Sequence, residues 1–198
     1  MTNRQAAAAE TRKKLVLAAK GLICEKGLTN VSVEEITQAC GVSKGTFYTY
    51  FKRKEDVVLE LSQSMFGVIL SEAMAVSGGI LPRLRYYLIH FSDYIEKGGV
   101  KMAQDWVGNV AHPEQCREGI DKLQLDSSSL KALLAAGVRD GELKPTAPVH
   151  ELAYCLTEVL YGQLLCWVLQ NGSYSLRART EGYCETELFA FLSPYLLS

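Results

Sequence analysis

A short segment between Ser43 and Phe51 carries hydroxyl and aromatic side chains in a pattern that suits hydrogen bonding to another molecule. When the residues are placed at helical steps of about 100°, Phe47 and Phe51 define one buried side. Thr49 lies directly opposite that side. The residues around Thr49 are the small Gly45 and Thr46, with Tyr48 and Tyr50 on the two flanks.

Such a surface suits insertion into a groove of double-stranded nucleic acid. Small central side chains let the backbone approach base edges, and flanking hydroxyl groups reach the phosphates. Lys44 adds positive charge where the helix begins, and Ser43 is placed to donate to a phosphate. Lys54, together with the amides that start the next helix, is expected to bind another phosphate. The alternative is an ordinary solvated helix whose tyrosines are half-buried packing residues.

Other chemistry is poorly represented. The sequence has no nucleophile elbow, metal-ligand spacing, phosphate loop or recognisable carboxylate pair, so we expect neither an enzyme nor a cofactor. None of the six cysteines is spaced as Cys-x-x-Cys, and we expect buried structural thiols. The alternative is a thiol switch through Cys116 or another exposed cysteine. The cysteines are Cys24, Cys40, Cys116, Cys155, Cys166 and Cys184.

The charge of the chain is unevenly distributed. Residues 1–54 carry ten Lys and Arg against four Glu, a net charge of +6, and the remaining residues carry a net charge of −7. A basic segment on an acidic body indicates that only the basic segment meets a polyanion. No stretch reaches the roughly 18 uninterrupted apolar residues of a membrane helix, and no signal peptide is recognisable. We therefore expect a cytoplasmic protein without a membrane segment.

Helical periodicity dominates the chain and predicts an all-α fold. In the basic segment, a first helix is expected from about Glu10 to Lys26. A second begins at a capping box formed by Ser32 and Glu35 and ends at Gly41. Ser43 then caps a third, short helix. Two short helices joined by a three-residue turn form a helix-turn-helix.

Six further helices are expected, which gives about nine in total. The fourth begins near Lys54 and ends at the glycines 78–79, and Pro82 is expected at the first position of the fifth, which ends at the glycines 98–99. The remaining helices are expected at 100–110, 114–140, 147–170 and 176–197. The predicted domains are a DNA-binding domain at 1–54 and a ligand-binding and dimerisation domain at 55–198.

The stretch from Val33 to Glu55 resembles the DNA-binding signature of the TetR family. The resemblance rests on the pattern G-V-S-x-G-x-x-Y-x-Y-F-x-x-K-E, which begins at Gly41, and it covers about residues 8–58. It implies that Lys44, Gly45, Thr46 and Thr49 face bases. It further implies that Ser32, Ser43, Tyr48, Tyr50 and Lys54 hold phosphates. Tyr50 departs from the family pattern, in which this position is often His.

The resemblance also implies a homodimer on a palindromic operator, with reading helices about 34–36 Å apart or somewhat more. The helix expected at 147–170 is apolar almost all round, and a helix without a polar face must be covered on both sides. In the family the last two helices of each subunit form a four-helix bundle, and this sequence is compatible with that arrangement.

The body holds amphipathic aromatic residues that suit a mostly apolar cavity for a small aromatic or apolar effector. The alternative is that they are plain core residues. The candidate lining residues are His90, Tyr94, Met102, Trp106, Tyr154, Tyr161 and Trp167. We expect a repressor that releases DNA when the effector binds; an activator and a regulator without a ligand are the competing hypotheses.

Overall fold

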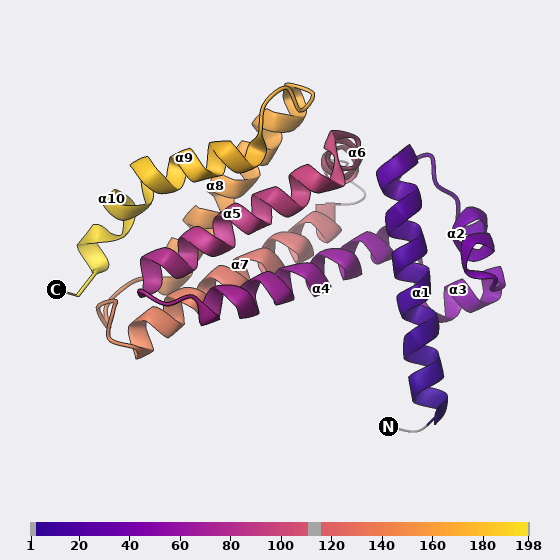
Figure 1. The fold of residues 1–198 in the computed structure, drawn as a ribbon, viewed down its shortest axis with the longest axis horizontal. Helices are drawn as coiled ribbons and strands as arrows, with labels where there is room; N and C mark the ends of the chain where they lie inside the picture. Colours follow the sequence, from indigo (N-terminus) through magenta and orange to yellow (C-terminus); the bar gives the residue numbers. More distant parts are fainter. Residues whose placement is uncertain (1–2, 111–115, 198) are drawn as a thin grey trace. The chain divides into compact units, whose positions relative to one another are not determined.

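The structure is a computed structural model that describes residues 3–110 and 116–197 (Figure 1). Within these ranges the regular structure is helical, as predicted. The helices are α1 (Asn3–Lys26), α2 (Val33–Cys40), α3 (Lys44–Tyr50), α4 (Lys54–Ala75), α5 (Ile80–Gly98), α6 (Val100–Val110), α7 (Cys116–Arg139), α8 (Val149–Leu169), α9 (Leu176–Thr186), α10 (Leu188–Leu192) and the 3₁₀ helix η1 (Ser193–Tyr195).

The chain forms two compact units that divide between Ser64 and Met65, inside α4. The sequence-based boundary after residue 54 falls at the start of the same helix. We call residues up to Ser64 the N-terminal unit and residues from Met65 the body.

The N-terminal unit is held together by a small apolar core. The caps form as the sequence predicts: Ser32 and Glu35 make a complete capping box at the start of α2, and Gly41 ends α2 with a φ of 67°. Only glycine adopts such a left-handed conformation at little cost, which fixes the sharp turn into α3. The buried residues are Leu15, Ala19, Ile23, Leu28, Val31, Ile36, Phe47, Phe51, Val57 and Leu61.

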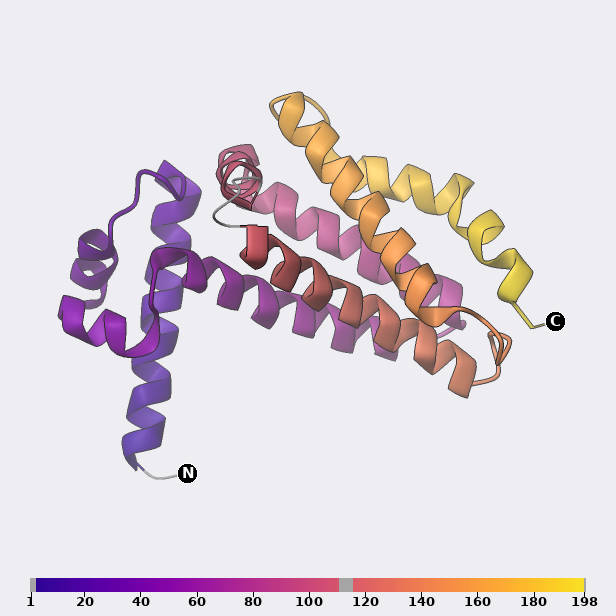
Figure 2. The ribbon, with the colours of Figure 1, turned by 180° about the vertical axis from the view of Figure 1, so that it is seen from behind.

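In the body, α7 packs on α8 and α5 packs on α9, as Figure 2 shows from behind. The end of the chain is fixed by main-chain hydrogen bonds from Lys144 N to the Tyr195 carbonyl (2.8 Å) and from Leu197 N to the Glu142 carbonyl (3.0 Å). The body core includes the fully buried residues Leu84, Tyr87, Leu88, Leu130, Leu133, Leu134, Leu143 and Leu156.

Several predicted helix ends are wrong. α1 begins at Asn3, because the alanines that follow favour a helix without needing an apolar stripe. α5 begins at Ile80, so Pro82 is its third residue rather than its first. The earlier start buries Ile80, and Pro82 is tolerated because the first-turn amides have no helical acceptor. The last predicted helix is broken at Glu187 into α9 and α10.

The cysteines are more exposed than the sequence predicts. Cys24, Cys155 and Cys166 are exposed free thiols, and Cys184 is buried. Because an apolar pattern does not reveal which side of a helix is covered, the expectation of buried thiols fails for these three. The side chain of Cys116 lies outside the described residues.

Among the described residues, α8 is long and apolar enough, by length and composition alone, to cross a membrane. Its residues Leu152, Leu156, Leu160 and Leu164 are buried in the body. A central core helix has the same composition, so this property by itself does not identify a membrane segment.

Candidate functional site

The exposed surface of α3 is built as the sequence predicts. Phe47 is fully buried, and its ring lies 5.5 Å from that of Phe51, which anchors the helix from behind. Gly45 and Thr49 are exposed, and the Tyr48 side chain is 57% exposed. The small residues therefore form the centre of an open surface.

The hydroxyl groups of this surface are oriented by bonds within the unit. Ser43 Oγ accepts from the Thr46 amide at 3.1 Å and lies 2.9 Å from Thr46 Oγ1. Thr49 Oγ1 donates to the Gly45 carbonyl at 3.0 Å. Because Thr49 has used its proton, its oxygen remains an acceptor and its methyl group an apolar contact.

The hydroxyl and the amide of Ser32 both form hydrogen bonds within the capping box. Its hydroxyl accepts from the Glu35 amide, and its own amide donates to Glu35 Oε2 at 2.8 Å. Lys26 also donates to Glu35, at 2.7 Å. This hydrogen bond, supported by those from Ser32, lowers the pKa of Glu35 to about 2.

Lys54 has a different role from the one predicted. Its ammonium donates to three main-chain carbonyls, those of Leu28 (2.7 Å), Thr29 (3.2 Å) and Val31 (2.9 Å). An ammonium has three protons, so all of them are used within the protein. Lys54 therefore fastens the segment between α1 and α2 to the start of α4, and the prediction that it holds a phosphate does not fit this geometry.

Other groups near α3 that could meet a phosphate also have partners in the protein. Lys44 forms an exposed ion pair with Glu34. The amides of Lys52 and Arg53, just before α4, donate to Asp56 Oδ2 at 2.9 and 3.0 Å. A phosphate would have to compete with this carboxylate for the two amides.

The predicted effector residues do not form one group. Tyr94 packs edge-on against Phe66 (5.4 Å between ring centroids), and Trp106 packs in the same way against Tyr161 (5.7 Å). Trp167 lies in a second core cluster, against which Trp106 also packs, and its Nε1 donates to the Tyr174 carbonyl at 2.8 Å.

The other three predicted residues have local partners. His90 Nδ1 donates to the Tyr86 carbonyl at 2.8 Å, and its ring stacks on that of Tyr86. Tyr154 packs against the ring of His150, on its own helix. The methyl end of Met102 lies where a side chain at Gly98 would be.

An unpredicted polar cluster lies in the body and includes one of the predicted residues. Lys122 and Asp126, one turn apart on α7, form a buried ion pair with side-chain exposures of 8% and 2%. The Tyr161 hydroxyl donates to Asp126 Oδ2 at 2.9 Å. The Lys122 ammonium also lies over the ring of Phe66, 4.6 Å from its centroid. We call Lys122, Asp126, Tyr161 and Tyr87 the buried polar cluster.

Burial has the same consequence for every ionisable group in this cluster, because it disfavours the charged form. It lowers the pKa of Lys122 and raises the pKa of Asp126. It also raises the pKa of the tyrosine hydroxyls of Tyr87 and Tyr161 well above the ordinary value.

The sequence contains a signal for this cluster. Lys122 and Asp126 precede Leu130 at successive intervals of four residues, so they continue the apolar stripe of α7 towards its N-terminus. A charged pair at positions that continue an apolar stripe has two interpretations: the stripe ends and the pair is exposed to solvent, or the pair is buried with the stripe. Only the packing of neighbouring helices distinguishes the two.

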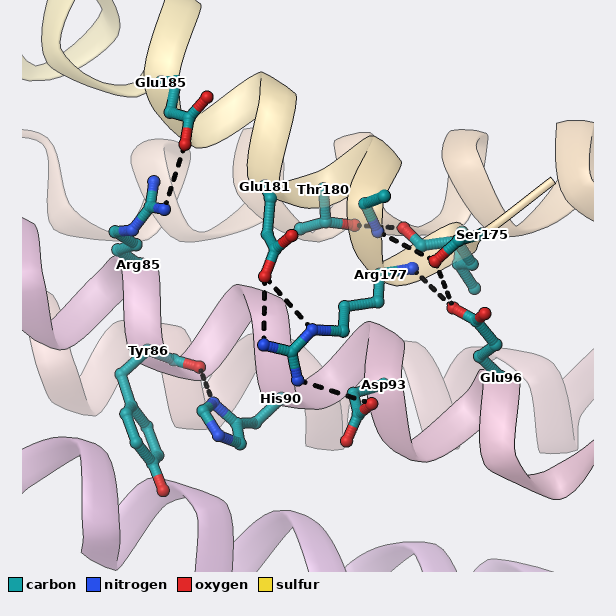
Figure 3. Close-up of polar contacts among 12 residues, drawn as sticks. Arg85, Tyr86, His90, Asp93, Glu96, Ser175, Arg177, Thr180, Glu181 and Glu185 are labelled. Carbon is teal, nitrogen blue, oxygen red and sulfur yellow. Dashed lines mark hydrogen bonds and ion pairs between the residues drawn. The ribbon is translucent and has the colours of Figure 1, made fainter.

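A second polar network fastens α9 to α5, as Figure 3 shows. Glu96 accepts from Ser175 Oγ at 3.0 Å and from the Arg177 amide at 2.7 Å, which caps the start of α9. Arg177 also pairs with Asp93 at 3.5 Å and with Glu181 at 3.0 Å. These groups satisfy one another, so we assign the network to helix packing.

Known proteins share this geometry. Residues 15–61 match the family model described as "Bacterial regulatory proteins, tetR family". The chain is 27% identical to the HTH-type transcriptional regulator AcrR of Shigella flexneri, over 93% of this chain and 91% of AcrR.

Two solved structures have a similar fold. A TetR-family regulator from Mesorhizobium loti aligns over the full length of both chains, with a TM-score of 0.75 and 20% identity. Thermus thermophilus FadR, in complex with lauroyl-CoA, aligns over 94% of this chain and 96% of its own, with a TM-score of 0.72 and 19% identity. The helix-turn-helix and these relatives define a DNA-binding transcriptional regulator. Residues 15–61 carry the DNA-binding region of the TetR family of bacterial regulatory proteins, and the chain resembles regulators of that family over most of its length.

Proposed function

We propose that this chain is a cytoplasmic repressor that binds a palindromic operator as a homodimer and releases it when a small apolar or aromatic effector binds. The observation that carries the DNA-binding part is the surface of α3, where exposed Gly45 and Thr49 lie opposite buried Phe47 and beside exposed Tyr48. Such a helix can approach base edges closely while its edges contact phosphates.

Each residue of this surface has a chemical role in the proposal. Thr49 presents a hydrogen-bond acceptor and a methyl group, which suit an exocyclic amine and a thymine methyl in the major groove. Gly45 lets the backbone approach, and the Tyr48 hydroxyl contacts a phosphate. Ser43, Thr46 and Tyr50 complete the surface, and the net charge of +6 on residues 1–54 attracts the duplex.

The proposed dimer is formed by α8 with α9 and α10. Leu165 and Leu169 of α8 are 44% and 75% exposed, and Phe189 of α10 is 63% exposed. Large apolar side chains that are exposed in a folded unit are typical of an interface. Six exposed residues of α8 repeat at intervals of four and three, which is the spacing of a helix-packing seam. They are Glu151, Cys155, Glu158, Gly162, Leu165 and Leu169; His150 and Cys166 are also exposed.

Release of DNA requires that the effector prefer the form that does not bind the operator. α4 begins in the N-terminal unit and ends in the body, so a change in its position is transmitted along one continuous helix. The lauroyl-CoA in Thermus thermophilus FadR supports a ligand-binding body in proteins of this fold.

Selection from a random duplex library, followed by binding measurements on the selected operator, tests the DNA-binding proposal. Thr49→Val should alter the discrimination between bases at one position of each half-site by about 1–3 kcal/mol of binding free energy. Tyr48→Phe should weaken binding to every duplex by the same factor, whatever its base sequence, because it removes a phosphate contact. Thr146→Val, at an exposed position between α7 and α8, is the matched control. If the protein selects no sequence and ignores duplex DNA at low salt, the proposal is wrong.

Sedimentation of the Leu165→Glu, Leu169→Glu double variant tests the dimer. The variant should be monomeric at concentrations where the wild type is a dimer. Leu17→Glu, at a site on α1 that is 56% exposed, should remain dimeric. A double variant that still sediments as a dimer would place the interface elsewhere.

A further inference from the structure

The buried polar cluster in the body is not explained by the stability of the fold. A buried ion pair between Lys122 and Asp126 is generally no more stabilising than apolar residues of similar volume, because both charges lose their hydration. Groups of buried ionisable residues are instead typical of functional sites. The cluster lies among aromatic residues from α4, α5, α6 and α8, and the candidate effector residues lie on the last three of these helices.

Two polar atoms of this cluster have no hydrogen-bond partner among the described residues, Asp126 Oδ1 and the Tyr87 hydroxyl. Asp126 is 2% exposed and Tyr87 is fully buried. Ser129 is a polar neighbour of the Tyr87 hydroxyl, but the two do not meet at hydrogen-bond geometry. Buried polar atoms in native proteins are almost always satisfied, so a missing partner points to a bound molecule.

The unsatisfied atoms define what that molecule must offer. Asp126 Oδ1 needs a donor, because Oδ2 already accepts from both Lys122 and Tyr161. The Tyr87 hydroxyl has a proton to give and needs an acceptor. A hydroxyl group satisfies both, since it donates one hydrogen bond and accepts others.

The charge of the cluster argues for a neutral molecule. Lys122 and Asp126 together carry no net charge, whether the proton stays on the ammonium or passes to the carboxylate. An anionic or cationic effector would therefore leave one buried charge uncompensated, which is costly at low dielectric.

The surrounding side chains provide the surface for an apolar body. Phe66 and Phe91 stack with their ring centroids 4.4 Å apart, and Trp106 contacts Tyr161. Trp106 and Tyr161 are both partly exposed, so the cluster borders the surface on their side. We infer that the effector is a neutral compound with an aromatic or apolar body and a hydroxyl group, which donates to Asp126 Oδ1 and accepts from Tyr87. This inference rests on the proposed ligand-responsive function.

Calorimetric titration of the purified full-length protein with matched probes tests the inference. The probes are phenol, 4-propylphenol and 2-naphthol, their methyl ethers, the corresponding carboxylates and amines, and lauroyl-CoA. We expect at least one of the hydroxyl compounds to bind about tenfold more tightly than its ether, which cannot donate to Asp126. It should also bind more tightly than its charged analogues.

Tyr87→Phe is the informative variant because the hydroxyl it removes has no partner in the free protein. It should fold as the wild type does, yet bind the hydroxyl compound several-fold more weakly while binding of the ether is unchanged. Tyr183→Phe, which alters a half-buried tyrosine packed against the same core from α9, is the matched control. The neutral double variant Lys122→Met, Asp126→Leu should lose the preference for hydroxyl over ether.

The inference is overturned if no hydroxyl compound binds, if a carboxylate, an amine or lauroyl-CoA binds more tightly, or if Tyr87→Phe leaves the hydroxyl-to-ether ratio unchanged. Operator binding without any probe, measured on the same preparation, keeps this result separate from the proposed function. Loss of operator binding would contradict the proposed function, whereas intact operator binding with the wrong probe profile contradicts only the effector class.

Discussion

Replacing Lys54 with methionine should destabilise the N-terminal unit without removing a contact to DNA. Methionine keeps most of the length of the side chain and loses the three hydrogen bonds to the carbonyls of Leu28, Thr29 and Val31. At about 1 kcal/mol for each bond, the loss is about 3 kcal/mol. The Thr29 carbonyl is exposed and regains water, so we expect a net loss of about 2 kcal/mol in the free energy of unfolding.

Urea unfolding followed by circular dichroism measures this change. Lys52→Met, at an exposed position two residues earlier and just before α4, removes the same charge and should alter the stability by less than about 0.5 kcal/mol. The dependence of operator affinity on salt provides a second measurement, since each phosphate contact contributes about 0.9 to the slope of log K against log salt concentration.

The two possible roles of Lys54, holding the loop after α1 or binding a phosphate, predict opposite results in these two measurements. If it fastens the loop after α1, Lys54→Met lowers the midpoint of unfolding and leaves the salt slope unchanged. If the variant instead unfolds like the wild type and its salt slope falls by about 0.9, Lys54 is a phosphate contact and the assignment made from the structure is refuted.

Three further predictions follow from single residues. Gly41→Ala should cost about 1–2 kcal/mol in urea unfolding, because its φ of 67° strains any side chain although no atom lies within 4 Å of the new Cβ; equal stability would contradict this. The pKa of Glu35 is lowered from 4.5 to about 2, so its charged form stabilises the fold above pH 4.5, and this contribution is lost as the pH falls towards 2. Glu35→Gln should therefore lose less stability than the wild type between pH 4.5 and pH 2. If the free energies of unfolding of the two proteins fall in parallel over this range, the pairing of Glu35 with Lys26 is contradicted. Burial raises the pKa of Cys184 to about 11, so iodoacetamide at pH 8 should modify exposed Cys24 first by mass spectrometry, and the reverse order would show that Cys184 is accessible.

The N-terminal unit could be predicted in detail because its signals are local. A capping box depends on residues three apart, and the buried side of α3 depends on Phe47 and Phe51, one turn apart. A left-handed turn at Gly41 follows from the chemistry of glycine. None of these features requires knowledge of a distant partner.

The roles of charged groups were less predictable because their partners are distant in the sequence. Lys54 lies in a motif that resembles a phosphate-binding position, yet the carbonyls that bind it are 23 to 26 residues earlier. Likewise, the sequence places Tyr161 among candidate effector residues but does not reveal that its hydroxyl meets Asp126, 35 residues away.

The sequence by itself therefore determined where α2 and α3 begin and end, and which face of α3 points outward, since both depend on contacts within one or two turns. Only the tertiary structure decided which helix faces in the body are covered. It buried Lys122 and Asp126, exposed Cys155 and Cys166, and divided the predicted effector residues among separate clusters. The physical reason is that burial depends on neighbouring helices, whereas periodicity specifies only which residues share a face.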